Sequence, residues 1–270
     1  MRAARSEYGT RMRRRLHPFQ SDPGAPFPEW LEVRRLGRIG YREGLELQRE
    51  LHAEVLRARE TATPRGFLLL LEHDPPVVTV SRRPGAAGNL IATEAAFAER
   101  GIQIEETDRG GDVTYHGPGQ LVAYPIVDLN LVRIRIHGWI RLLEQVVIDA
   151  LASFDCPADR DPGATGVWVG RSGDDADCSG GRKIAAVGVR VSRWITMHGL
   201  AVNVDPNLTH FDTIVPCGLV GRPVTSLARE VGRAPAGIPD MAQVTAAVGA
   251  GFARHLSNPG PFQERPSSGG

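Results

Sequence analysis

The stretch that decides the fold runs from residue 183 to residue 204 and reads KIAAVGVRVSRWITMHGLAVNV. Its apolar and β-branched residues predict two strands, at 184–191 and 197–204, with a short polar break between them. Strands this close in the sequence favour antiparallel neighbours in one sheet. Further short apolar runs predict strands at 30–33, 67–72, 77–80, 102–105, 121–128 and 167–169.

Segments with helical spacing alternate irregularly with these strands. Apolar residues recur every three or four positions at 41–60, 137–154 and 240–255, and a shorter helix is predicted at 93–100 with Thr93 as its N-cap. The combination predicts an α+β fold, in which helices flank a mixed and largely antiparallel sheet.

The two ends of the chain differ from its middle. Residues 1–28 are rich in Arg and Pro without periodicity, and residues 256–270 are rich in Ser, Pro and Gly. The sequence therefore predicts a flexible leader at 1–28, a single domain at 29–255 and a flexible tail at 256–270.

The composition is that of a folded globular protein, with 41% hydrophobic and 23% charged residues among 270. The 32 basic and 31 acidic side chains give a formal net charge of +1, so no overall field favours nucleic acid or an anionic membrane. The longest apolar runs are the size of a strand and too short to span a bilayer. Prolines follow the N-terminal arginines where a secretion signal would have its apolar core, so a cytoplasmic protein is predicted.

The three cysteines, Cys156, Cys178 and Cys217, are too few and too scattered for a disulfide framework, and their spacing does not indicate a metal site. Cys217 lies between Pro216 and Gly218, in a predicted bend that can present its sulfur to a pocket. A small buried packing residue is an equally good interpretation of Cys217. For Cys156 and Cys178 an inert role is favoured.

Lys183 is the only lysine, so 31 of the 32 basic side chains are arginine. An amine, unlike a guanidinium, can lose its proton and take part in acid–base chemistry. Chance survival of one surface lysine is the alternative interpretation. A nearby ammonium lowers the pKa of a thiol, so Lys183 and Cys217 fit as a dyad in which the lysine activates the cysteine.

The segment RGGDVTYHGPGQ at 109–120 holds four glycines, one arginine and one histidine. Glycines let a backbone approach a ligand closely, and Arg109 can meet an anionic or carbonyl group. The patterns of a P-loop and of a dinucleotide-binding turn are absent from it. A ligand-binding loop between two strands is predicted, with a plain tight turn as the alternative.

Six blocks in this order resemble the lipoyl(octanoyl) transferase family. They are LLLLEH at 68–73, the loop at 109–120, GVWV at 166–169, KIA at 183–185 with Gly188, HGLAVNV at 198–204, and PCG at 216–218 with TSL at 225–227. The resemblance covers about residues 65–230. It implies a fold similar to the catalytic domains of biotin and lipoate ligases.

The resemblance also implies a reaction, the first step of endogenous protein lipoylation. An octanoyl group passes from octanoyl-acyl carrier protein to a lysine of the lipoyl domains of 2-oxoacid dehydrogenases or of the glycine cleavage H protein. No cofactor, metal, ATP, nucleic acid or membrane is implied, and a monomer is expected.

The site residues follow from the same resemblance. Cys217 matches the nucleophile that forms an acyl thioester in ping-pong kinetics, and Lys183 matches the residue that lowers its pKa. Lys183 is also a candidate base for the acceptor amine. The matched substrate-binding residues are Arg109, Gly110, Gly111, Asp112, Val113, Thr114, Tyr115, His116, Ala186, Val187, Gly188, Gly199, Leu200 and Ala201.

Two features depart from the family pattern. Ser81 stands where family members often have glycine, and the segment at 170–182 is longer than usual. Both bear on the rim of the pocket and on the acyl-chain length that it accepts rather than on the type of reaction. His116 and His198 are expected to orient groups or to pack, and neither is assigned a catalytic role.

Three other functions remain open from the residues. An ATP-dependent lipoate or biotin ligase would leave Cys217 without a role. A thiol hydrolase would pair Cys217 with His116 or His198 and use water as the acceptor. A non-catalytic module would bind acidic acyl carrier proteins or lipoyl domains through a basic patch. Candidates for that patch are Arg133, Arg135 and Arg141.

Overall fold

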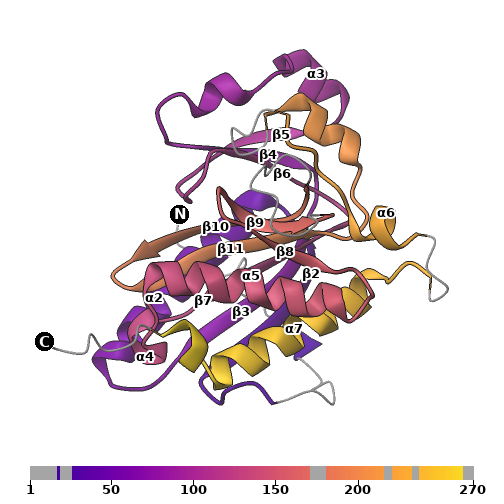
Figure 1. Cartoon of the computed structure of the whole chain (residues 1–270). Helices are drawn as coiled ribbons and strands as arrows, with labels where there is room; N and C mark the ends of the chain where they lie inside the picture. Colours follow the sequence, from indigo (N-terminus) through magenta and orange to yellow (C-terminus); the bar gives the residue numbers. More distant parts are fainter. Residues whose placement is uncertain (1–16, 19–25, 171–180, 216–220, 233–236, 264–270) are drawn as a thin grey trace, which may run out of the picture.

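The computed structural model describes residues 17–18, 26–170, 181–215, 221–232 and 237–263. Its main feature is an eight-stranded sheet in the order β1-β2-β3-β7-β11-β10-β9-β8 (Figure 1). Among the described pairs of this sheet only β2 and β3 are parallel, so the predicted mixed, largely antiparallel α+β fold is confirmed. The strands are β1 (His17–Pro18), β2 (Leu31–Ile39), β3 (Gly66–His73), β7 (Gln120–Ile126), β8 (Ala158–Asp161), β9 (Ala164–Val169), β10 (Arg182–Ser192) and β11 (Ile195–Asn203).

The stretch 183–204 forms the hairpin of β10 and β11, whose register runs to the pair Ser192 and Ile195. The two turn residues, Arg193 and Trp194, have φ angles of 52° and 64°. A two-residue hairpin turn matched to the strand twist requires this left-handed conformation, although glycine and asparagine adopt it more readily. The regular alternation along both strands, rather than the turn, therefore specifies the register.

Helices cover both faces of the sheet (Figure 1). Leu68 and Leu70 of β3 pack with α5 and α7, whereas Leu69 and Leu71 pack with α2 on the other face. A continuous apolar run is the pattern of a strand that is covered on both sides. The three helices are α2 (Tyr41–Glu60), α5 (Ile136–Ala152) and α7 (Met241–Ser257), close to their predicted ranges.

A second sheet of three strands lies beside the β10 and β11 hairpin (Figure 1). Its order is β5 (Gln103–Thr107), β4 (Val77–Ser81) and β6 (Val113–His116). The prediction of a loop throughout 109–119 is therefore wrong in part, because β6 lies inside it. The glycines on either side of this short strand obscured its alternation.

The N-cap prediction for the short helix is confirmed. Oγ1 of Thr93 accepts a hydrogen bond from the backbone N–H of Ala96 at 3.3 Å, and α3 (Glu94–Glu99) follows. Not predicted were β8, α4 (Leu129–Val132) and α6 (Leu227–Val231), which have four or five residues each and are too short to show a period. Three short 3-10 helices complete the described elements: η1 (Ala86–Asn89), η3 (Leu208–Thr213) and η5 (Gly260–Phe262).

The packed part of the chain extends past the predicted limit at residue 255. Leu256 continues the apolar stripe of α7 and is only 4% exposed. Farther on, the Gln263 side chain donates a hydrogen bond to the carbonyl of Val132 at 2.8 Å. Contacts of the described chain thus extend beyond residue 255. For the leader at 1–28 and the rest of the tail, flexibility stays a prediction.

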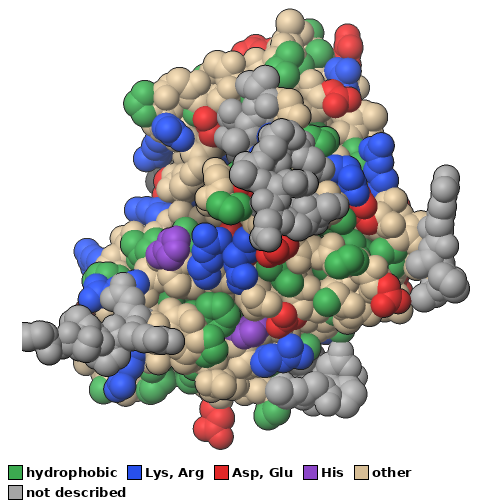
Figure 2. All heavy atoms as spheres, viewed as in Figure 1, with side chains coloured by type: hydrophobic (Ala, Val, Ile, Leu, Met, Phe, Trp, Pro, Cys, Tyr) green, Lys and Arg blue, Asp and Glu red, His purple; other side chains and the backbone are tan. Residues whose placement is uncertain are grey.

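The surface agrees with the balanced composition. On the face shown in Figure 2, basic and acidic side chains are interspersed with apolar ones. No helix in the described part of the chain combines the length and the hydropathy that a membrane span requires.

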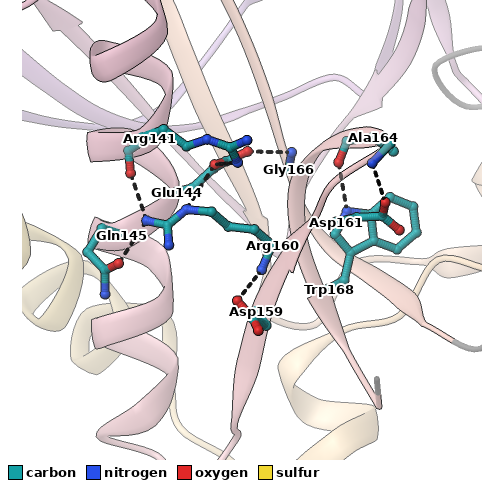
Figure 3. A network of polar contacts seen from close by, with 10 residues as sticks. Arg141, Glu144, Gln145, Asp159, Arg160, Asp161, Ala164, Gly166 and Trp168 are labelled. Atoms are coloured by element: carbon teal, nitrogen blue, oxygen red, sulfur yellow. Dashed lines mark hydrogen bonds and ion pairs between the residues drawn. The ribbon is translucent and has the colours of Figure 1, made fainter. Parts of the chain in front are cut away.

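A buried carboxylate joins α5 to β8 and β9 (Figure 3). Glu144 is 1% exposed and accepts hydrogen bonds from Arg141 at 2.8 Å and from Arg160 at 3.2 Å. Its other oxygen accepts the backbone N–H of Gly166 at 3.1 Å. Arg141 therefore binds a buried acid of its own chain, and its proposed place in a docking patch is not supported.

We expect Glu144→Ala to destabilise the protein by about 3–5 kcal/mol, because two guanidinium groups and one buried N–H lose their shared acceptor. Urea unfolding at neutral pH measures the change. The matched control is Glu50→Ala on exposed surface of α2, expected to stay within about 0.5 kcal/mol of the parent. Equal stability of the two variants would contradict this account.

Candidate functional site

A cavity lies between the β10 and β11 hairpin and the glycine-rich loop, with β6, β7 and α2 closing its sides. All predicted substrate-binding residues except Asp112, Val113 and Tyr115 line it. The lining residues are Tyr41, Arg109, Gly110, Gly111, Thr114, His116, Tyr124, Ala186, Val187, Gly188, His198, Gly199, Leu200 and Ala201.

The three exceptions have other contacts. Val113 and Tyr115 alternate with Thr114 and His116 along β6, so they point into the core of the small sheet. The Tyr115 hydroxyl lies 3.0 Å from Nδ1 of His210. The Asp112 carboxylate accepts a hydrogen bond from the Asn89 side chain at 3.0 Å. None of the three lies among the residues that line the cavity.

The loop closes on the hairpin because glycine is present on both sides of the contact. The backbone N–H of Gly110 donates to the carbonyl of Val189 at 2.9 Å. A Cβ atom at Gly188 would lie only 3.0 Å from the Gly110 carbonyl oxygen, and Gly111 has a φ angle of 92° that glycine adopts without strain. The glycines in this motif therefore serve a close approach of two backbones.

Arg109 meets carbonyl groups, as its sequence context suggested, but they belong to its own chain. Its guanidinium donates to Oγ1 of Thr79 at 2.8 Å and to the carbonyl oxygens of Thr79 and Asp112, each at 3.2 Å. These bonds hold the loop against β4. The side chain thus builds the cavity wall as well as lining the cavity.

His73 supports the cavity from behind. It is fully buried, and its Nδ1 lies 3.2 Å from the Ile39 carbonyl, which can only accept a hydrogen bond. Nδ1 therefore carries the proton, and Nε2 accepts the hydroxyl of Tyr124 at 2.8 Å. Burial lowers the pKa of His73 to about 4, so the ring is neutral near pH 7.

A second buried histidine begins a polar chain that leads toward Lys183. Nδ1 of His116 lies 2.6 Å from Oε1 of Gln120, whose amide donates to Asn203 at 2.8 Å. Asn203 in turn donates to the carbonyl of Thr225 at 2.8 Å. Burial, reinforced by nearby His73, lowers the pKa of His116 to about 3.

His198 joins the loop to the hairpin. Its Nε2 lies 2.9 Å from the carboxylate of Asp108, which also accepts a hydrogen bond from Arg190 at 2.6 Å. The hydrogen bond from His198 lowers the pKa of Asp108 to about 2. His198 has a φ angle of 59°, and its backbone N–H donates to Gln48 at 2.6 Å. A non-glycine residue in this conformation is strained, so the surroundings hold it there.

Lys183 does not line the cavity; it lies on β10, three residues before Ala186. It is 7% exposed, and its Nζ lies 5.3 Å from the centroid of the Trp168 ring. Its backbone N–H donates to the Pro223 carbonyl at 2.8 Å, and the N–H of Thr225 donates to the Lys183 carbonyl at 2.9 Å. The strand that carries the lysine is thus tied to the segment that begins at Gly221.

Gly166 leaves room for the lysine side chain. It has a φ angle of 126°, and a Cβ atom there would lie 2.7 Å from Cε of Lys183 and 2.6 Å from the carbonyl oxygen of Ala185. Since the Gly166 N–H binds buried Glu144 at 3.1 Å, the network of Figure 3 reaches the surroundings of Lys183.

Cys217 and Cys178 lie outside the described residues, as does most of the segment at 170–182. Cys156 is 2% exposed, and burial raises the pKa of its thiol to about 11. A thiol held in its protonated form is a poor nucleophile, which agrees with the inert role predicted for Cys156.

Sequence reasoning missed Tyr41 and Tyr124 and left His198 without a role. Tyr41 is the first residue of a long helix, and Tyr124 lies in a fully buried strand, where an aromatic residue is ordinary packing. Polar residues in predicted core strands were the available signal, because buried polar groups need a partner. That signal also marks Gln120 and Asn203.

We expect acid to destabilise the protein through His73. Its folded-state pKa of about 4 lies below the ordinary 6.5, so the unfolded chain binds its proton first as the pH falls. The free energy of unfolding should therefore drop by about 2 kcal/mol from this group between about pH 7 and about pH 5. Urea unfolding at both pH values measures the drop.

His73→Gln should remove about 2 kcal/mol of the drop and leave the contribution of His116, whose pKa is also lowered. His137→Gln, on exposed surface of α5, should leave the pH dependence unchanged. An equal slope in both variants would show that His73 is not the group responsible.

Comparison with known proteins gives a consistent set of relatives. The model of the lipoyl protein ligase A/B catalytic domain matches residues 40–253. The octanoyltransferase of Solibacter usitatus is 48% identical, over 73% of this chain and 81% of that protein. The octanoyltransferase of Acidobacterium capsulatum is 46% identical, over 76% of this chain and 82% of that protein.

Solved structures agree on the fold. Lipoate-protein ligase A bound with ATP superposes with a TM-score of 0.61 at 15% identity, over 84% of this chain and 85% of that chain. The bipartite lipoate protein ligase of Thermoplasma acidophilum gives a TM-score of 0.58 at 15% identity, over 86% and 85%. With a family model that matches most of its length, this chain belongs to the lipoyl protein ligase A/B catalytic domain family.

Proposed function

We propose that this protein is an octanoyltransferase that moves an octanoyl group from octanoyl-acyl carrier protein to a lysine of a lipoyl domain. The observation that carries the proposal is the 42–48% identity to proteins named octanoyltransferase. The lipoate ligases share the fold at only 15% identity. The activity therefore follows the octanoyltransferases rather than the ligases.

The proposed reaction has two steps, an exchange of one thioester for another and the aminolysis of the second thioester to an amide. The Cys217 thiolate attacks the carbonyl carbon of the carrier thioester; the carrier thiolate leaves and takes up a proton. The amine of the acceptor lysine then attacks the new thioester, an amide forms, the carbon–sulfur bond breaks, and the amine loses a proton. Since one thioester replaces another in the first step, ATP is not required.

The surroundings of Lys183 support its role as partner of Cys217. A buried ammonium stabilises a nearby thiolate more strongly than an exposed one, because water screens it less. Pro223 and Thr225, which follow Cys217 by a few residues, hydrogen-bond to the Lys183 backbone at 2.8 Å and 2.9 Å. When Lys183 gives its proton to the departing carrier thiolate, its neutral amine becomes available as the base that takes a proton from the incoming lysine amine.

The cavity is suited to an acyl chain. Ala186 and Ala201, which are paired on β10 and β11, give it small apolar side chains next to the strand of Lys183. Burial keeps the nearby histidines neutral near pH 7, so no positive charge of theirs opposes an apolar ligand. We assign the predicted substrate-binding residues that line this cavity to the octanoyl group and its carbonyl end.

Acceptors of this chemistry are lipoyl domains, among them those of 2-oxoacid dehydrogenases and the glycine cleavage H protein. The sequence-based expectations of a cytoplasmic monomer that acts without cofactor, nucleic acid or membrane belong to this proposal and stay predictions. So do the limits of the acyltransferase domain at 29–255.

Intact-mass measurement after mixing with octanoyl-acyl carrier protein, without ATP, tests the proposal. We expect one octanoyl increment that hydroxylamine removes, and its loss in Cys217→Ser, since a hydroxyl is far less nucleophilic than a thiolate. An added lipoyl domain should then gain the octanoyl group. A folded protein that neither gains nor transfers the group would exclude the transferase and leave the ligase or the binding module.

Analysis of the products distinguishes the transferase from the remaining alternative, a thiol hydrolase. Release of free octanoate at the same rate with and without lipoyl domain would identify a thiol hydrolase instead.

Gly166→Ala tests the position of Lys183. The added Cβ would displace the lysine side chain, and we expect acylation of Cys217 to slow about hundredfold. The pH profile of acylation should also shift upward, because the thiol loses its ammonium partner.

The matched control for Gly166→Ala is Gly163→Ala in the turn between β8 and β9. There the nearest atom to a new Cβ is Oδ1 of Asp161 at 3.5 Å, so rate and profile should stay unchanged. A slow Gly166→Ala enzyme with an unshifted profile would show that the glycine serves stability alone.

A further inference from the structure

We propose that the end of the cavity farthest from Lys183, formed by Tyr41, Tyr124 and His198, sets the length of the acyl chain that the enzyme accepts. The inference rests on the proposed transferase function. It concerns the preferred length of the acyl chain, which the amino-acid sequence alone does not predict.

The sheet register gives the cavity a direction. On β10 the lining residues run from Ala186 to Gly188, away from Lys183. The antiparallel partner strand places Ala201 opposite Ala186 and Gly199 opposite Gly188. The level of the two glycines, next to His198, is therefore farthest from the lysine. A chain attached near Lys183 directs its methyl end there.

The residues of β10 and β11 that face the loop form the floor of the cavity. This floor leaves room for an acyl chain only over a limited length. Small side chains at Ala186 and Ala201 leave space beneath the loop. At Gly188 the glycine-rich loop lies directly against β10, since a Cβ atom there would lie 3.0 Å from the Gly110 carbonyl oxygen and 3.2 Å from Cδ of Arg109. The cavity has no spare depth at this level.

One side of the end wall is held by His73. The hydroxyl of Tyr124 donates to its Nε2 at 2.8 Å, and the ring of Tyr41 packs edge-on against it with centroids 5.3 Å apart. Both tyrosines are only 3% exposed. Moving either ring would disturb a packed and hydrogen-bonded group with no water to replace its partner.

The other side is held by Asp108. It binds His198 at 2.9 Å and Arg190 at 2.6 Å, while the backbone N–H of His198 is held by Gln48 at 2.6 Å. The imidazole is thus fixed from its ring and from its backbone. The ring of Tyr124 meets it at right angles, with centroids 6.0 Å apart.

Because of this end wall, the affinity of the enzyme for an acyl chain depends on the length of the chain. Each methylene buried over the floor favours binding about fourfold. A methylene that reaches the wall gains nothing and must displace the packed ring of Tyr41 or the ring of Tyr124, whose hydroxyl is bonded to His73. Preference therefore rises with length up to the wall and falls beyond it.

An internal competition tests the proposal. Hexanoyl, octanoyl, decanoyl and dodecanoyl thioesters of acyl carrier protein are mixed in equal amounts with the enzyme and a lipoyl domain, and the masses of the acylated domain are compared at early times. Because all donors compete for the same enzyme molecules, partial unfolding of a variant lowers the total product but not the ratios.

We expect Tyr124→Leu and Tyr41→Leu each to raise the decanoyl-to-octanoyl ratio about tenfold, since space opens for two further methylenes. Gly188→Ala should act in the opposite direction and raise the hexanoyl-to-octanoyl ratio about fourfold. The matched control is Phe252→Leu, which removes a buried aromatic ring of α7 on the other face of the sheet, outside the cavity. Its ratios should equal those of the parent.

Parent-like ratios in both tyrosine variants would overturn the proposal, as would an equal shift in Phe252→Leu. A parent enzyme that acylates no lipoyl domain with any of the four donors would instead overturn the transferase function itself.

Discussion

The approach of the glycine-rich loop to the β10 and β11 hairpin is the constraint on which the site depends. It brings a connection of the small sheet against the large sheet through the bond of 2.9 Å between Gly110 and Val189. A side chain at Gly188 would press on that loop. Arg109 and Asp108 hold the loop from its two neighbours, β4 and the hairpin. The cavity exists because these contacts are made together.

Many of the polar groups around the cavity have their hydrogen-bond partners within the protein. Burial lowers the pKa of His73 and of His116, so both rings are neutral near pH 7. Gln120 and Asn203 extend the bonding from His116 to Thr225, which binds the backbone of Lys183. Such a network orders the walls of the cavity and the surroundings of the lysine at once. The proposed acyl ligand would thus lie in a site whose walls are held largely by hydrogen bonds.

The sequence predicted the fold class and the long elements, because their periods are strong and uninterrupted: helix α2 and the strands of the hairpin are the clearest cases. It missed β6, where four residues between glycines leave little pattern to detect. Most residues that line the cavity could also be predicted from the sequence, since glycine motifs mark close backbone contacts. Tyr41 and Tyr124 could not be predicted, because their part in the cavity depends on the packing of α2 and β7. The fourteen matched binding residues stay predictions in their roles, and Cys217 lies outside the described structure.

The nearly complete replacement of lysine by arginine has a consequence for the acyl-enzyme. Lys183 is the one side-chain amine in the chain, and it is 7% exposed within a sheet. Guanidinium groups stay protonated and do not attack thioesters. Apart from buried Lys183, the described part of the chain therefore has no side-chain amine, so under the proposed function one copy of the enzyme offers another no exposed lysine as an acceptor.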